Sequence, residues 1–357
     1  MARLAMCGWE SGSVDEWGIQ SLRVAAVTAS ESIQPTARTG RYAFRSQWSS
    51  YSNYLANNMR SGVLPSSPNE VWIRLAIAQI TVYSYYGTHL HTFLELTDRT
   101  IMQIGFGYTS GVPSVLQVFR GVTVIATGGR LPIGATFRLF EAHVIIHGVT
   151  GVVQVWLDGI LVIDFTGNTL SSDTAQITDI RIGGHKLTSI GASTGESMSI
   201  DFDDFAINDT AGTVNNGRIG QGGIIALFPT GDTSAKIFTP STGTNNYSLV
   251  NSVPIDYDTT YVQAGSVGDC DLYQKGNLSV GNIVNAVMPV VQGRTVSGVT
   301  AGIALTLRSN SISVVSSTFL LQQSYFPVSQ LWETDPATNG AWTLTALNSL
   351  QVGITVM

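Results

Sequence analysis

The feature that most constrains the fold of this chain is a short hairpin signal at residues 153–165, VQVWLDGILVIDF. Apolar side chains alternate with other types on both sides of Asp158-Gly159. An Asp-Gly pair between two such runs predicts a two-residue turn in which both turn residues take a positive φ. The stretch therefore predicts an antiparallel strand pair.

Similar short runs, rich in Val, Ile, Thr and aromatic residues, recur between clusters of Gly, Pro, Asn and Ser. Many short strands at steady spacing favour an antiparallel β-sandwich or jelly roll over parallel βαβ units. One short helix is expected within 342–352, a stretch that opens at a Thr that can cap it. The expected strands are 71–80, 91–97, 102–108, 115–120, 123–126, 137–147, 152–157, 160–165, 177–182, 198–207, 283–291, 302–308 and 311–319.

The length of 357 residues favours two domains. A polar, Gly-rich stretch at 208–223 separates the strand-rich N-terminal part from a segment that carries Pro229, Pro240 and Pro254. We therefore expect a jelly-roll domain at 1–212, a linker or extended arm at 213–264, and a smaller β-sandwich-like domain with a short terminal helix at 265–357.

Composition excludes several function classes. Charged residues are only 12% of the chain and the net charge is -6, with no basic stripe, which argues against nucleic-acid binding. No apolar run approaches the ~20 residues of a membrane span, and the N-terminus lacks the apolar core of a secretion signal. Cys7 and Cys270 show no metal-ligand spacing and are expected to be free thiols.

The residue pattern also argues against hydrolysis of polysaccharides. Retaining hydrolases need two carboxyl groups about 5 Å apart on one face. Glu95 and Asp98 are three residues apart, so strand alternation places them on opposite faces. Asp201 and Asp203 alternate, but no third carboxylate follows at that spacing. We therefore predict no catalytic residues and no enzymatic activity.

Tyrosines give the clearest hint of binding. Tyr83, Tyr85, Tyr86 and Tyr108 fall in segments expected to reach one sheet face and its loops. Sugar rings stack on aromatic faces, but tyrosine is also enriched in protein interfaces. A carbohydrate-binding face and a packing or subunit contact both remain open.

Several segments resemble known proteins. CGWESGS (7–13), RTGRYAF (38–44), VVQVWLDGILVID (152–164) and SIDFDDFAIND (199–209) resemble concanavalin A-like, laminin-G-type jelly rolls. The order in which these and the later segments follow one another along the whole chain is similar to that in a group of tailed-bacteriophage virion proteins. The similarity is most specific in NDTAGTVNNGRIG (208–220) and in the terminal block at 331–354. In many such jelly rolls a structural calcium ion joins the first and last strands. The resemblance implies Glu10, the Gly40 region and Asp204 as its ligands.

The resemblance implies a structural component of a phage particle, on the capsid surface or tail. It would be located in the virion and act by packing against other virion proteins and copies of itself. The alternative is a receptor-binding adhesin whose jelly roll recognises host surface glycan. Nucleic acid and membrane are not expected as partners.

Overall fold

The computed structural model describes residues 2–16, 20–23, 28–50, 57–84, 89–99, 101–109, 115–131, 134–187, 196–296 and 298–357. Contacts divide the chain into two compact units. The first comprises residues 1–10 and 17–225, and the second comprises 11–16 and 226–357.

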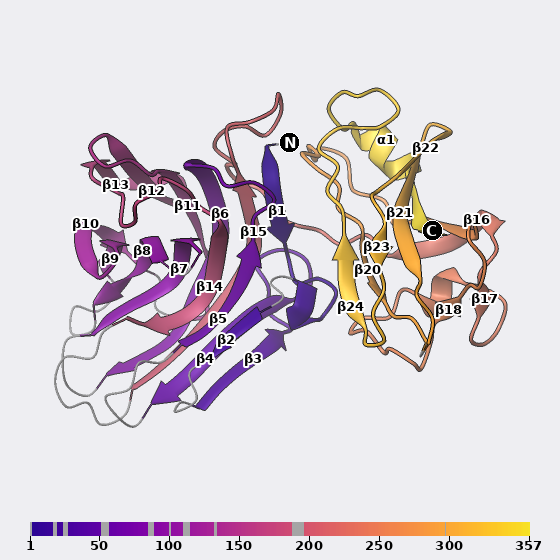
Figure 1. Cartoon of the computed structure of the whole chain (residues 1–357), viewed down its shortest axis with the longest axis horizontal. Coiled ribbons are helices and arrows are strands. Elements are labelled where there is room, and N and C mark those ends of the chain that lie inside the picture. The colour runs from indigo at the N-terminus through magenta and orange to yellow at the C-terminus, as the bar shows by residue number, and fades with distance from the viewer. Residues whose placement is uncertain are drawn as a thin grey trace. The chain divides into compact units, whose positions relative to one another are not determined.

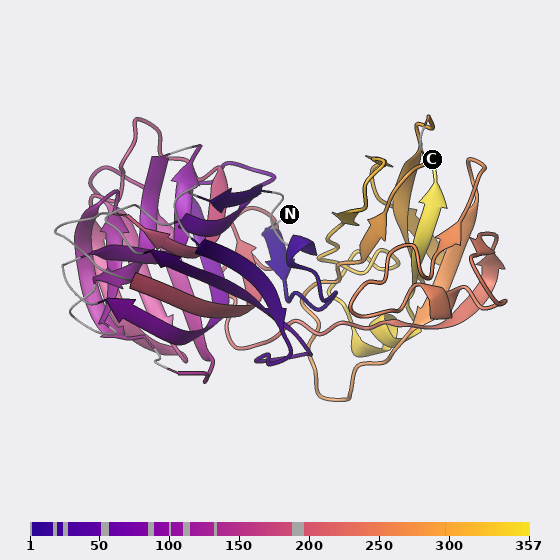
Figure 2. The same ribbon diagram turned by 90° about the horizontal axis from the view of Figure 1, so that it is seen from below.

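Unit 1 is a sandwich of two antiparallel sheets, which lie one over the other (Figures 1 and 2). The eight-stranded sheet has the order β13 (Ile160–Gly167), β12 (Gly151–Leu157), β11 (Arg138–Ile145), β6 (Glu70–Ser84), β15 (Glu196–Asn208), β4 (Ala43–Ser50) and β3 (Thr28–Gln34), with β1 (Arg3–Cys7) also paired to β15. The seven-stranded sheet has the order β10 (Thr123–Arg130), β9 (Val115–Arg120), β8 (Ile101–Thr109), β7 (Leu90–Asp98), β14 (Asp179–Lys186), β5 (Asn57–Val63) and β2 (Gln20–Arg23).

Aromatic contacts join the two sheets. Phe140 of β11 meets Phe93 of β7 and Phe106 of β8 edge to face, at centroid distances of 5.5 and 5.1 Å. All three side chains are buried, and burial of each contributes about 1.5–3 kcal/mol relative to exposure. These contacts fix which side of the seven-stranded sheet faces the core. We call its opposite side the front face.

The hairpin prediction is confirmed. Leu157 pairs with Ile160 across a two-residue turn, and Asp158 and Gly159 have φ of 50° and 83°. The Asp158 carboxylate also accepts a hydrogen bond from Leu139 N at 2.8 Å, so the turn is tied to the next strand. The predicted all-β antiparallel sandwich is likewise confirmed.

Unit 2 is built on an antiparallel sheet with the order β16 (Pro229–Lys236), β19 (Cys270–Lys275), β25 (Gln351–Val356), β21 (Gly302–Ser309) and β22 (Ile312–Val315), with β23 (Phe319–Leu320) paired to β21. The unit has two further two-stranded sheets, β17 (Thr239–Pro240) with β18 (Val262–Gln263) and β20 (Val290–Gly293) with β24 (Phe326–Ser329). The unit also holds the 3-10 turns η1 (Val14–Glu16) and η2 (Tyr247–Leu249) and the helix α1 (Leu344–Ser349). Thr343 caps this helix, because its side chain accepts from Ala346 N at 3.0 Å.

The units differ from the expected boundaries at 212 and 264. Residues 213–225 belong to unit 1, and Arg218 pairs there with Glu141 at 2.7 Å. Residues 226–264, expected to form an arm, belong to unit 2 because β16 pairs with β19. Proline and the bulges in this pairing interrupt the alternation that would have marked β16 as a strand.

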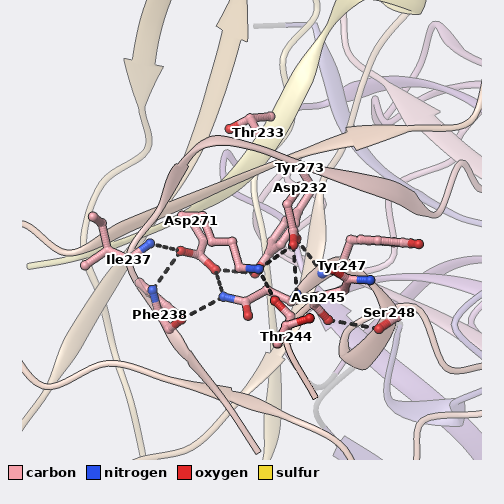
Figure 3. Close-up of polar contacts among 12 residues, drawn as sticks. Asp232, Thr233, Ile237, Phe238, Thr244, Asn245, Tyr247, Ser248, Asp271 and Tyr273 are labelled. Carbon is pink, nitrogen blue, oxygen red and sulfur yellow. Dashed lines mark hydrogen bonds and ion pairs between the residues drawn. The ribbon is translucent and has the colours of Figure 1, made fainter. Parts of the chain in front are cut away.

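A buried carboxylate organises one loop of unit 2. Asp271 on β19 is fully buried and accepts hydrogen bonds from Ile237 N, Phe238 N, the Asn246 side chain and the Tyr273 hydroxyl, at 2.6, 2.8, 2.6 and 2.9 Å. Figure 3 shows this carboxylate reaching from the sheet to the backbone of the loop. The network therefore fastens residues 237–247 to the sheet.

No helix in the described part of the chain is long and apolar enough to span a membrane.

Candidate functional site

The front face carries a group of charged side chains on neighbouring strands. Glu95 of β7 lies opposite Arg181 of β14, and His185 of β14 lies two pairing positions away, opposite Thr92. The His185 Nδ1 and Glu95 Oε1 atoms are 2.7 Å apart, and the nearest nitrogen of Arg181 lies 3.6 Å from Glu95 Oε2. Thr92 donates its hydroxyl to Glu95 Oε1 at 2.6 Å.

A bulge in β7 brings Thr92 and Glu95 to one face. The pairing of β7 with β8 shifts register between Thr92 and Leu94, so the extra residue, Phe93, packs inward beside Leu94. Thr92 and Glu95 therefore share the front face although they are three residues apart, a spacing that plain alternation would place on opposite faces.

In β14 the pairing with β7 shifts register between Ile182 and His185, while the pairing with β5 runs without a shift, so Arg181 and His185 alternate regularly onto one face. A side chain at Gly184 would point into the core, because a Cβ there would lie 2.7 Å from Trp48 Nε1. His185, the next residue, consequently points to the front face. The Gly183-Gly184 pair thus allows the strand to deliver an imidazole beside Glu95.

The three ionisable side chains, Glu95, His185 and Arg181, differ in solvent exposure, and this difference decides which of them can contact a ligand. The Glu95 side chain is only 1% exposed, whereas those of His185 and Arg181 are 19% and 15% exposed. Burial alone would raise the pKa of Glu95, but the charge of His185, hydrogen bonds from His185 and Thr92, and Arg181 outweigh burial and lower this pKa. Glu95 is thus a buried anion that orients His185, and His185 and Arg181 reach solvent.

Polar groups continue along the front face. Gln117 of β9 lies opposite Gly107, which in turn lies opposite Thr92. Thr109 donates its hydroxyl to Gln117 Oε1 at 2.5 Å. The face thus presents hydrogen-bonding groups on several strands beside the charged group.

Of the four tyrosines predicted to bind carbohydrate, Tyr108 is the one whose side chain the structure describes. Tyr85 and Tyr86 and the side chain of Tyr83 lie outside the described residues. Tyr108 is 2% exposed and points into the core, where its ring stacks on His91 at 5.0 Å. Tyr108 therefore has no ring face open to a sugar, because β8 places it on the same side as Phe106.

His91 belongs to a polar pocket of the core rather than to the front face. Its ring is sandwiched between Tyr108 and Trp48, the latter at 5.8 Å. Burial, with smaller contributions from Lys186 and two histidines, lowers the pKa of His91 to about 3. His91 is therefore neutral and buried at physiological pH.

The residues implied as calcium ligands lie around one loop. Both oxygens of Glu10 accept from Arg41 N, at 3.0 and 2.9 Å, and a Cβ at Gly40 would collide with the same carboxylate. Asp204 accepts from the Thr39 hydroxyl at 2.5 Å and from Arg38 at 2.7 Å. Within the described ranges no group of three His, Cys, Asp or Glu side chains is arranged to hold a metal ion. The calcium site stays a prediction.

Several polar groups elsewhere in the described residues have structural partners. His143 stacks on Trp72 at 3.8 Å and contacts Glu70 at 2.8 Å, while Glu141 binds Arg218 from the segment after β15. In unit 2 the buried Asp271 carboxylate accepts the hydrogen bonds of the donors around it. Neither arrangement presents a reactive group to solvent as the front face does.

Sequence reasoning missed the Glu95–His185 pair because its members are 90 residues apart. The signal that could have located it is the Gly183-Gly184 pair directly before a histidine in a strand, since adjacent glycines in a strand often mark a bulge. The local sequence pairs Glu95 only with Asp98, three residues later, and gives no link to a residue of β14.

No family model and no curated protein matches this chain. Among solved structures, the chain is similar to an endo-β-1,4-glucuronan lyase from the fungus Trichoderma reesei, with 12% identity and a TM-score of 0.43 over 58% of this chain and 95% of that one. It is also similar to the alginate lyase Aly36B (9%, TM-score 0.36, 58% and 97%). A third match is the catalytic domain of a glycoside hydrolase family 131 protein from Coprinopsis cinerea (11%, TM-score 0.39, 62% and 98%).

These matches are carbohydrate-processing enzymes. They overturn the predictions that this chain is a structural or receptor-binding component of a phage particle and that it is not an enzyme. The resemblance to phage virion proteins, the location in a virion and the partners stay predictions. At these identities the matches concern the fold, so the chemistry must be read from the side chains of this chain.

Proposed function

We propose that the front face of unit 1 is a catalytic site that cleaves an acidic, uronate-containing polysaccharide by β-elimination. The observation that carries this proposal is the hydrogen bond between the buried Glu95 and the partly exposed His185, with Arg181 beside them. A carboxylate that holds an imidazole in one orientation is a recurrent way to prepare a general base.

His185, rather than Glu95, is the reacting group. Glu95 is almost completely buried, so a sugar ring does not reach it. Its lowered pKa also keeps it ionised, which makes it unsuited to donate a proton to a glycosidic oxygen. With Nδ1–H donated to Glu95, His185 Nε2 is the unprotonated atom and can accept a proton. Hydrolysis with Glu95 as the acid is therefore the weaker assignment.

The proposed reaction needs no reagent beyond the chain and its substrate. His185 Nε2 takes the C5 proton of the uronate, the C4–O4 bond breaks, and a C4–C5 double bond forms. The proton held by His185 then passes to O4 of the departing sugar. A positive charge near the uronate carboxylate makes the C5 proton more acidic, and Arg181 is the cation placed to supply it.

The test is an ultraviolet assay for the unsaturated product, with alginate, glucuronan and polygalacturonate as substrates. The native chain is expected to form this product from at least one of them, and His185→Gln is expected to lower kcat at least a hundredfold. Arg181→Lys should chiefly raise KM, because a lysine keeps the charge but loses the planar guanidinium. His147→Gln, in an exposed turn, is the matched control.

Two results would contradict the proposal. One is the absence of unsaturated product from all three substrates with folded native chain. The other is product formation at the native rate in His185→Gln, which would place the chemistry elsewhere.

A further inference from the structure

Unit 2 carries an exposed cluster of aromatic and charged side chains that is separate from the site proposed above. Tyr257 and Asp258 lie in a turn after residue 256, where Thr259 N donates to Asp256 O at 3.1 Å. Arg294 directly follows β20 and Tyr325 directly precedes β24. Because Gly293 pairs with Phe326, these two side chains emerge next to each other at the end of the strand pair.

The contacts within this cluster hold Asp258 in one orientation. Its Oδ1 accepts from Arg294 Nε at 3.2 Å, Arg294 Nη2 at 2.8 Å and the Tyr325 hydroxyl at 2.8 Å. The guanidinium of Arg294 also lies 5.2 Å from the centroid of the Tyr325 ring. The Asp258 side chain is nevertheless 64% exposed, and its Oδ2 makes none of these contacts. The carboxylate is thus fixed through one oxygen while the other faces solvent.

Tyr257 lies beside this carboxylate without being buried. Its ring centroid is 5.2 Å from that of Tyr325, with a tilt of 58°, yet the residue is 44% exposed. Its φ of 53° is in the left-handed region, which is unfavourable for a residue with a bulky side chain. A strained backbone that displays an aromatic ring to solvent contributes little to packing, so packing alone does not account for it.

We propose that Tyr257, Tyr325, Asp258 and Arg294 form a binding site for a neutral hexopyranose unit of a polysaccharide. The exposed tyrosine ring offers a flat apolar surface for the C–H face of a sugar ring. Asp258 Oδ2 accepts hydrogen bonds from sugar hydroxyls, and its orientation is already fixed by Arg294 and Tyr325, so little ordering is needed on binding.

Charge decides between neutral and acidic sugars. Arg294 is paired with Asp258, so the cluster carries no net positive charge. The oxygen that faces solvent is anionic and would repel a uronate carboxylate. This site therefore differs in ligand class from the front face of unit 1, where Arg181 lies beside the reacting imidazole. The inference does not rest on the proposed lyase activity.

Affinity electrophoresis of the full chain tests the proposal. Native gels contain one soluble neutral glycan each (hydroxyethylcellulose, laminarin, dextran or galactomannan) or alginate. The native chain is expected to be retarded by at least one neutral glycan, and Tyr257→Ala to weaken that retention about fivefold or more. Tyr325→Phe removes only the hydroxyl and should weaken it less. Tyr261→Ala, at another exposed tyrosine of unit 2, is the matched control and should bind like the native chain.

Three outcomes would overturn the proposal. The first is no retardation by any of the four neutral glycans. The second is equal retardation of the native chain and Tyr257→Ala, with thermal melting showing both to be folded. The third is a change of sedimentation in Tyr257→Ala, with glycan retention unchanged. That result would identify the cluster as a contact between copies of the chain.

Discussion

Replacement of Asp271 by alanine should destabilise unit 2 strongly. The carboxylate is fully buried and accepts four hydrogen bonds, two from backbone N–H groups and two from side chains. Alanine supplies no acceptor, and the N–H groups of Ile237 and Phe238 cannot turn to another partner. The substitution therefore leaves these donors without their acceptor in the loop that Figure 3 shows.

The magnitude follows from counting the donors that cannot be satisfied elsewhere. The Tyr273 hydroxyl can rotate, which leaves three fixed donors: two backbone N–H groups and the Asn246 amide. An unsatisfied buried donor costs about 1–3 kcal/mol. Water in the vacated space and at Ile237, which is 60% exposed, relieves part of this cost, so we expect a loss of about 3–5 kcal/mol. That is a large fraction of the ~5–15 kcal/mol typical of a folded domain.

Two milder variants grade the effect. Asp271→Asn keeps one oxygen for the backbone donors but turns an amide towards the Asn246 amide, so we expect an intermediate loss. Tyr273→Phe removes a single hydrogen bond and should cost about 1 kcal/mol. Burial and the Asp271 carboxylate raise the pKa of Tyr273, so this hydroxyl remains protonated and able to donate.

Urea denaturation, followed by circular dichroism and limited proteolysis, measures the loss. In Asp271→Ala the transition of unit 2 should move to lower urea while that of unit 1 keeps its midpoint. Asp269→Ala is the control, because the side chain of Asp269 accepts one hydrogen bond, in an exposed turn, from Ser266 N. A loss below about 1 kcal/mol in Asp271→Ala would refute the reasoning, since the buried donors would then have other partners.

Three further predictions concern unit 1. Glu95→Gln removes the charge that orients His185 and should lower kcat about a hundredfold with a smaller change in KM, measured as formation of unsaturated product. Burial and the neighbouring Asp204 raise the pKa of Asp203, so above about pH 4 the folded chain retains a proton there that the unfolded chain has released. The free energy of unfolding should therefore fall as the pH rises from about 4 towards the raised pKa of Asp203, and it should level off above that pKa. Midpoints of urea denaturation measure this fall, which should be weaker in Asp203→Asn. Chelation by EDTA should leave the melting midpoint unchanged, because backbone and side-chain donors already occupy the oxygens of Glu10 and Asp204; a lower midpoint would support the predicted calcium site.

The parts of the fold that sequence predicted correctly are those set by local chemistry. The Asp158-Gly159 turn needs only two residues that tolerate a positive φ, and α1 needs only Thr343 and a few apolar residues. The strand β16 was missed because its apolar pattern is weak and its pairing with β19 is interrupted twice. Its place in the sheet depends on residues far away in the chain, which no local pattern reports.

The candidate site failed to emerge for a related reason. Alternation correctly places Arg181 and His185 on one face of β14, but Thr92 and Glu95 share that face only because a register shift in β7 breaks the alternation. A bulge changes the face of every later residue in its strand. A sequence analysis that misses one bulge therefore assigns residues of the same site to opposite faces of the sheet.

The two proposed sites can be separated experimentally because they differ in charge and lie in different units. His185→Gln should abolish cleavage of a uronate polymer without changing retention by a neutral glycan. Tyr257→Ala should weaken retention by the neutral glycan without changing the cleavage of a short soluble uronate substrate. If each variant impairs only its own assay, the chain combines an acidic-polysaccharide site with a neutral-sugar contact. If His185→Gln weakens retention by the neutral glycan as well, that glycan binds at the front face, and the assignment of the Tyr257 cluster is wrong.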